Sequence, residues 1–75
     1  MEREIVEGLR RHGCTVFVLS DAGAPDLLVG HHGQWTPMEI KAEAGTLTAL
    51  QVQTLRCVPV VHTLREALGV MRGLR

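Results

Sequence analysis

Residues 25–41 read PDLLVGHHGQWTPMEIK and decide the fold of this 75-residue chain. A short apolar run follows Asp26, a second run begins at Gln34, and a two-residue turn at His32-Gly33 predicts an antiparallel hairpin. Counting outward from that turn, Asp26 faces Glu39, and their Cβ atoms lie ~4.5–5.5 Å apart. At an effective dielectric constant of ~20, two like charges at this distance repel each other by roughly 3 kcal/mol. Folding alone offers no reason for such a pair, whereas a divalent cation, which prefers clustered carboxylates, does.

Strand periodicity places Lys41 on the same face as Glu39. Two metal-binding acids with a lysine beside them predict hydrolysis of a phosphodiester. The alternative for Asp26 is turn chemistry, since Pro-Asp is a common turn dipeptide. The alternative for Lys41 is a solvated lysine at the strand end, paired with Glu39 or Glu43. Pro37 cannot donate a ladder hydrogen bond, so it predicts a bulge or an unpaired stretch in the second strand of the hairpin.

The whole chain, residues 1–75, is expected to form one α/β domain with a mixed, four-stranded sheet and helices on its faces. The first strand is apolar on both sides, which predicts cover on both of its faces. Thr48 with Gln51, and Thr63 with Glu66, fit capping boxes at helix starts. The strand before residue 48 and the strand after it then form a parallel, right-handed crossover. The expected elements are a helix at 2–12 ended by Gly13, strands at 15–19, 26–31 and 34–42, a helix at 48–56, a strand at 59–62 and a final helix opened by Thr63.

Composition limits the functional classes. The formal net charge is zero, so nucleic-acid binding would depend on local basic patches such as Arg10 and Arg11. The chain shows neither a secretory signal nor a stretch long enough to cross a membrane, which predicts a cytoplasmic protein. A domain this small buries only ~60% of its unfolded surface, so a homodimer is expected. Cys14 and Cys57 lack metal-type spacing and are expected to be inert core thiols.

The element order, with Pro25-Asp26 and Glu39-Ile40-Lys41, resembles the PD-(D/E)XK nuclease superfamily and its restriction-endonuclease-like α-β-β-β-α-β core. Residues 2–5 with Leu9 and Gly13 are similar to the opening helix of archaeal-type Holliday junction resolvases. Residues 45–48 followed by Gln51 are similar to VRR-NUC domains. The short length resembles the stand-alone VRR-NUC proteins of phages and bacteria. The resemblance covers nearly the whole chain.

This resemblance implies metal-dependent cleavage of DNA. Asp26, Glu39 and the backbone carbonyl of Ile40 would bind Mg2+ or Mn2+, and Lys41 would position or activate the attacking water. Glu2 would join the metal site from the first helix. Glu4 and Glu7 are rival candidates on that helix, and the alternative for Glu2 is an acid that favours the helix dipole.

Gln51 would bond the lysine, a water or DNA, although its place in the capping box already explains it. Ser20 would contact a phosphate, against the simpler reading as a turn hydroxyl, and Arg10 and Arg11 are candidate DNA contacts. His31 and His32 are expected to point to opposite faces at the hairpin tip, with DNA contact favoured over metal binding.

Trp35 is expected to be a packed or dimer-interface residue, with base stacking as the alternative. The resulting expectation is a homodimeric endonuclease selective for branched DNA, in the manner of a Holliday junction resolvase. The alternatives are a flap or single-strand DNA repair nuclease, and a nucleic-acid-binding module of the same fold that has lost catalysis.

Overall fold

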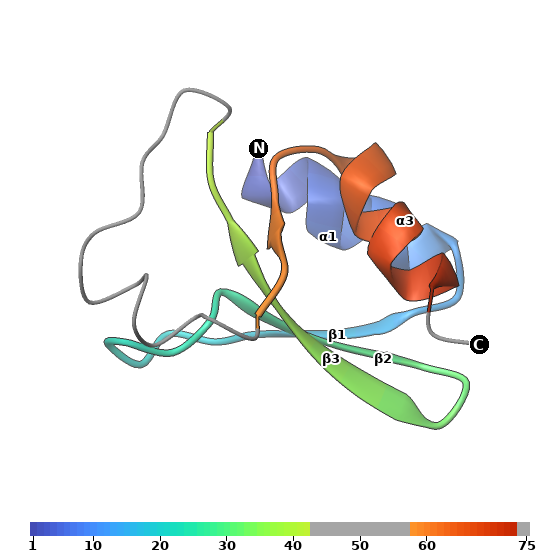
Figure 1. The fold of residues 1–75 in the computed structure, drawn as a ribbon, viewed down its shortest axis with the longest axis horizontal. Coiled ribbons are helices and arrows are strands. Elements are labelled where there is room, and N and C mark those ends of the chain that lie inside the picture. Colours follow the sequence, from blue (N-terminus) through green and yellow to red (C-terminus); the bar gives the residue numbers. More distant parts are fainter. Residues whose placement is uncertain (43–57, 74–75) are drawn as a thin grey trace.

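The computed structural model describes residues 1–42 and 58–73, and Figure 1 shows the arrangement of their elements. The sheet has the order β1-β2-β3-β4, with antiparallel pairing between β1, β2 and β3 and parallel pairing between β3 and β4. The expected mixed, four-stranded α/β sheet is therefore confirmed. The helix expected at 48–56 lies outside the described residues. The elements are α1 (Glu2–Arg11), β1 (Thr15–Val18), β2 (Leu27–His31), β3 (Gln34–Ile40), β4 (Val60–Val61) and α3 (Leu64–Arg72).

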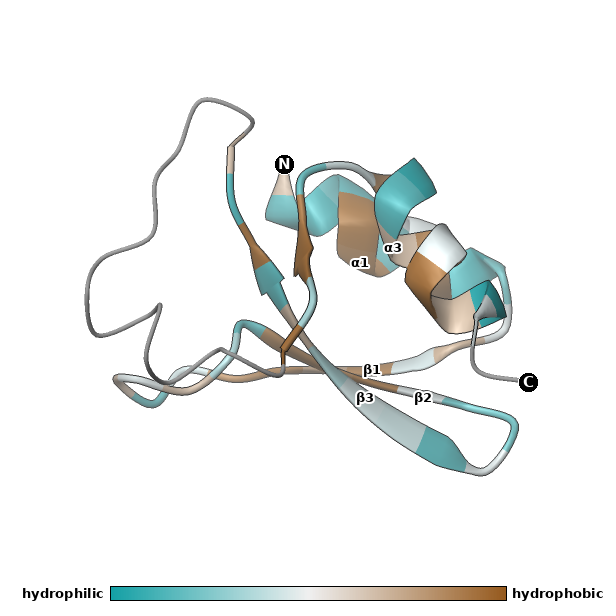
Figure 2. Ribbon diagram, viewed as in Figure 1, coloured by the Kyte–Doolittle hydropathy of each residue, from teal (hydrophilic) through white to brown (hydrophobic). Residues whose placement is uncertain are grey.

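The helices α1 and α3 lie side by side on one face of the sheet (Figure 1). Alternation along the strands turns Leu27, Val29 and Met38 toward these helices, and all three side chains are fully buried. Ile5 and Leu9, four residues apart on α1, supply the facing apolar stripe. Figure 2 shows the hydrophobic strand segments beneath the helices and the hydrophilic end of the hairpin.

The hairpin register is the predicted one. His31 pairs with Gln34 and Leu27 pairs with Met38 across the β2–β3 ladder. His32 and Gly33 both have positive φ, as a type I′ turn requires at its two central positions. Continuing the ladder by one residue sets Asp26 opposite Glu39.

The predicted bulge at Pro37 was wrong, because Pro37 pairs in regular register with Leu28. The amide of Glu39, two residues on, donates to the carbonyl of Pro59 on the β4 side of the strand (3.0 Å). By the same alternation, the missing N–H of Pro37 points to that side, where the β3–β4 ladder has not yet begun. The pairing of β3 with β2 therefore loses no hydrogen bond, and a strand tolerates proline at such a position.

The prediction that the first strand is covered on both faces was also wrong. β1 is an edge strand of the sheet, and Phe17, which points away from the helices, is 54% exposed. In the described ranges 1–42 and 58–73, no helix has the length and apolar character needed to cross a bilayer.

The helix ends follow the predicted caps with one change. Gly13 has a φ of 88°, the left-handed conformation expected after α1. The Thr63 hydroxyl accepts from the amide of Glu66 (3.1 Å) at the start of α3. The Glu66 carboxylate, however, accepts from the amide of His62 (2.6 Å), one residue before the expected partner. Cys14 is buried as expected, and burial raises the pKa of its thiol.

Candidate carboxylate site at the end of the hairpin

The carboxylates of Asp26 and Glu39 each accept a hydrogen bond from a backbone amide across the hairpin. The amide of Asp26 donates to Oε1 of Glu39 (3.2 Å), and the amide of Ile40 donates to Oδ2 of Asp26 (2.9 Å). Each carboxylate therefore accepts from a backbone amide on the other side of the hairpin, just before the first residue of β2. These bonds give the pair a structural role, so the expectation that folding alone has no use for it needs this correction.

The two carboxylates lie on the sheet face opposite the helices. Leu27 and Met38 point into the core, so their neighbours Asp26 and Glu39 point the other way. Glu39 is nevertheless only 3% exposed, and Asp26 is half-buried. A buried acid beside a second acid is an expensive arrangement unless a proton or a cation compensates it.

The pKa of Glu39 is raised above its ordinary value of 4.5. Burial, which disfavours the ionised form, is the largest cause, and the hydrogen bond and charge of Asp26 add to it. The amide of Asp26 and the charge of Lys41 act in the opposite direction and lower the pKa. The charge of Lys41 therefore acts on Glu39, which is consistent with the predicted placement of both residues on one face.

His62 holds the end of the strand that carries Lys41. The amide of Lys41 donates to the carbonyl of Val61 (3.1 Å), which continues the parallel ladder past Ile40. Nδ1 of His62 lies 2.8 Å from the carbonyl oxygen of Lys41. Because a carbonyl only accepts, Nδ1 carries the proton and donates.

The role of His62 was not predicted from the sequence. The signal was present, because His62 ends the strand predicted at 59–62, which was expected to run parallel to the predicted strand that carries Lys41. In a parallel ladder, the residues that follow two paired strands at the same end become neighbours.

The donor chemistry of the pair fits a magnesium-type cation. Mg2+ usually binds through one or two carboxylates, keeps several waters and shares substrate phosphates. In residues 1–42 and 58–73, no cluster of three or more His, Cys, Asp or Glu side chains suits a metal. Asp26 and Glu39 are therefore only a pair of carboxylates that could hold a cation together with waters, and the carbonyl of Ile40 follows Glu39 directly in the chain. The structure does not bring Glu2, Glu4 or Glu7 into a cluster with them.

The remaining predicted site residues lie in several places. Ser20 is exposed between β1 and the turn that leads to Asp26. Arg10 and Arg11 are on α1, which covers the sheet face that does not carry the carboxylate pair. A guanidinium nitrogen of Arg10 donates to the carbonyl of Val16 (2.9 Å). Gln51 lies outside the described residues.

One prediction about the hairpin tip was wrong. The rings of His31 and His32 do not point to opposite faces; they stack with centroids 3.8 Å apart, because His32 has left the strand for the positive-φ turn. Trp35 stacks on Phe17 but is 53% exposed, and its expected place at a dimer interface stays a prediction.

Comparison of the chain with protein-family models, with curated proteins and with solved structures found no match.

Proposed function

We propose that this chain is a metal-dependent DNA endonuclease that hydrolyses phosphodiester bonds at the Asp26–Glu39 pair. The observation that carries the proposal is a buried glutamate placed against an aspartate, with the charge of Lys41 acting on it. The amide hydrogen bonds that the two acids accept leave their mutual repulsion in place, whereas a divalent cation compensates both charges. The resemblance to VRR-NUC domains and Holliday junction resolvases adds the expectation of DNA as substrate.

Each residue of the site has a distinct role in the proposed reaction. Asp26 and Glu39 hold the cation, with the carbonyl of Ile40 as a further donor. A bound Mg2+ or Mn2+ supplies polarisation of the phosphate and a hydroxide near neutral pH. Hydrolysis forms one P–O bond to the water oxygen and breaks one P–O ester bond, so negative charge gathers on the phosphate oxygens. The Lys41 ammonium stabilises that charge, and His62 positions Lys41 through its backbone.

The decisive experiment incubates the protein with labelled four-way junction, flap and linear duplex DNA, with Mg2+, with Mn2+ and with chelator. The proposal expects cleavage only with a cation and its loss in Asp26→Asn and Glu39→Gln. Asp21→Asn is the matched control, because Asp21 is an exposed acid in the preceding turn. Preference for the junction supports a resolvase acting as a homodimer with two sites, and preference for flaps supports a repair nuclease. The absence of cleavage of every one of these substrates would refute the proposed nuclease activity.

One observation favours a second candidate, a nucleic-acid-binding module of this fold without catalysis. The bonds from the amides of Asp26 and Ile40 use the two carboxylates to close the open end of the hairpin, and the raised pKa of Glu39 favours a proton between them instead of a cation. This candidate expects DNA binding that is unchanged by chelator, without any cleavage. A titration with labelled DNA, with and without Mn2+, separates the two candidates.

A further inference from the structure

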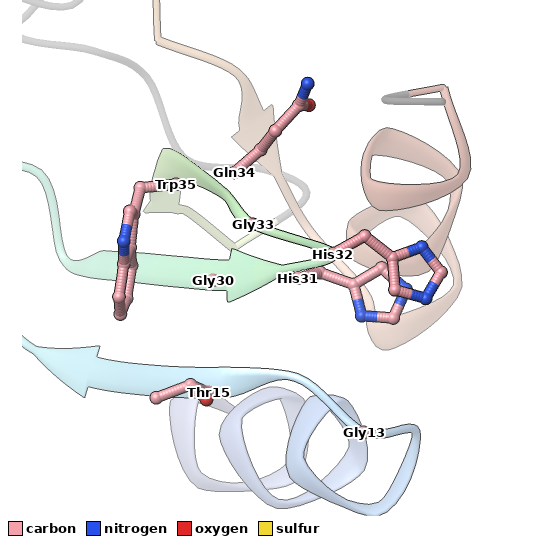
Figure 3. A pocket seen from close by; sticks show the side chains of 8 residues that line it. All are labelled: Gly13, Thr15, Gly30, His31, His32, Gly33, Gln34 and Trp35. Atoms are coloured by element: carbon pink, nitrogen blue, oxygen red, sulfur yellow. The ribbon is translucent and has the colours of Figure 1, made fainter.

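A hollow of about 200 Å³ lies beside the turn of the hairpin, at the opposite end of β2 and β3 from Asp26 and Glu39 (Figure 3). We call it the tip hollow. The Trp35 ring stands at one end of it, the rings of His31 and His32 stand at the other, and Gly30 lies between them on β2. The residues that line it and have side chains are Thr15, His31, His32, Gln34 and Trp35.

The Trp35 ring is held in place by its neighbours. Phe17 stacks on it with the ring centroids 5.5 Å apart and the planes 14° from parallel. Gly30, its cross-strand partner, brings bare backbone against the indole, and a Cβ there would lie 2.8 Å from Cζ3 of Trp35. Phe17 covers part of the indole, and the exposed part that lines the tip hollow is a stacking surface for another flat ring.

Apart from Trp35, the side chains that line the tip hollow are polar, and none of the described residues that line it is acidic. The Thr15 hydroxyl, the Gln34 amide and the His31 and His32 rings can all donate hydrogen bonds. A second hollow adjoins the first at His31 and is lined also by His12 and Arg72. Aromatic faces with basic and amide groups around them suit a nucleobase and its phosphates.

The Trp35 end of the tip hollow lies on the same sheet face as Glu39. Trp35 and Glu39 are four residues apart on β3, so they share a face and lie ~13 Å apart. That span corresponds to about four stacked nucleotides at ~3.4 Å each, or fewer in a stretched strand. One strand of DNA can therefore occupy both sites at once.

From this geometry we propose that the tip hollow binds an unpaired base of the DNA substrate, stacked on Trp35. The inference rests on the proposed function and specifies it, because it selects DNA with unpaired bases a few nucleotides from the scissile bond. A base inside a duplex cannot enter the hollow without leaving its stack.

Binding is tested in chelator, so that it is independent of cleavage. Trp35 is the single tryptophan of the chain, so its fluorescence reports on the hollow directly. Single-stranded oligothymidine is expected to quench it, and duplex DNA of equal length is not. By anisotropy, Trp35→Leu should weaken single-strand binding about 5-fold or more. Trp35→Phe should retain most of the affinity, and Val18→Ala, an exposed apolar control on β1, should be unchanged.

Unchanged fluorescence at saturating oligothymidine, or equal binding by Trp35→Leu, would overturn the inference. A fluorescence change that follows protein concentration without DNA, together with no response to DNA, would instead make Trp35 a contact between two copies of the chain.

Cleavage assays with single abasic sites then separate this inference from the proposed function. Rates should fall most when the missing base lies about two to four nucleotides from the cut. Cleavage that is insensitive to every abasic position defeats the tip hollow and leaves the nuclease. Quenching without cleavage of any DNA defeats the nuclease and leaves the tip hollow as a single-strand binding site.

Discussion

Replacing Glu39 with glutamine should stabilise the protein at neutral pH in the absence of divalent cations. Glutamine keeps the volume and an oxygen that accepts from the amide of Asp26, and it removes one of two neighbouring negative charges. Unit charges ~5 Å apart repel by roughly 3 kcal/mol at an effective dielectric constant of ~20. Lys41 offsets part of this repulsion. A net gain of about 1–2 kcal/mol is therefore expected, which for a domain of this size is ~4–16 °C in Tm.

The pH dependence of this gain follows from the raised pKa of Glu39. The folded state keeps the Glu39 proton to higher pH than the unfolded chain does, so unfolding releases a proton in that range. The free energy of unfolding of the wild type should fall as pH rises from about 4.5 through the raised pKa. Glu39→Gln should lack this fall, so the difference between the two proteins should grow toward neutral pH.

The assay is urea unfolding followed by circular dichroism from pH 4 to pH 8, in chelator, with Asp21→Asn as the control. Adding Mn2+ should stabilise the wild type, by ~2.7 kcal/mol at a hundredfold excess over its Kd, and leave Glu39→Gln unaffected. A variant no more stable than the wild type at pH 7, with the same pH profile, would refute the argument that the two carboxylates repel each other in the fold.

Three further predictions concern the lysine, its support and the core. Lys41→Ala should abolish cleavage and leave DNA binding nearly intact, as measured by single-turnover rates and anisotropy; equal loss of both would make Lys41 a phosphate contact. His62→Leu should lower kcat more than it changes KM, and His62→Asn, which can still donate to the Lys41 carbonyl, should recover most of the rate; no recovery would assign His62 a packing role only. Leu27→Ala should cost about 2–5 kcal/mol in urea unfolding, because Leu27 is fully buried between sheet and helices, and a smaller loss would place the core elsewhere.

The hairpin shows how far local sequence rules reach. The two-residue turn, the alternation of apolar residues and the pairing of Asp26 with Glu39 were all predictable, because register in a tight hairpin follows from counting outward from the turn. The same local rules placed the Gly13 cap and the Thr63 cap. Gln51, the DNA substrate and the homodimer stay predictions.

The errors arose where a residue's environment depends on distant segments. Pro37 suggested a bulge, yet it fits a regular strand because the neighbouring β4 begins only at its pairing with Glu39. Phe17 suggested a strand covered on both sides, yet β1 is at the sheet edge, and the two helices within residues 1–42 and 58–73 lie on the other face.

The sequence by itself determined the α/β class, the mixed sheet and the facing pair of carboxylates, because periodicity, caps and turns act over a few residues. Only the tertiary structure decided the burial of Glu39, the bond from His62 to the Lys41 carbonyl and the placing of Trp35 between Phe17 and the tip hollow. These features join residues that are far apart in the chain. Their positions follow from which strands pair and which face the helices cover, and no local pattern specifies either.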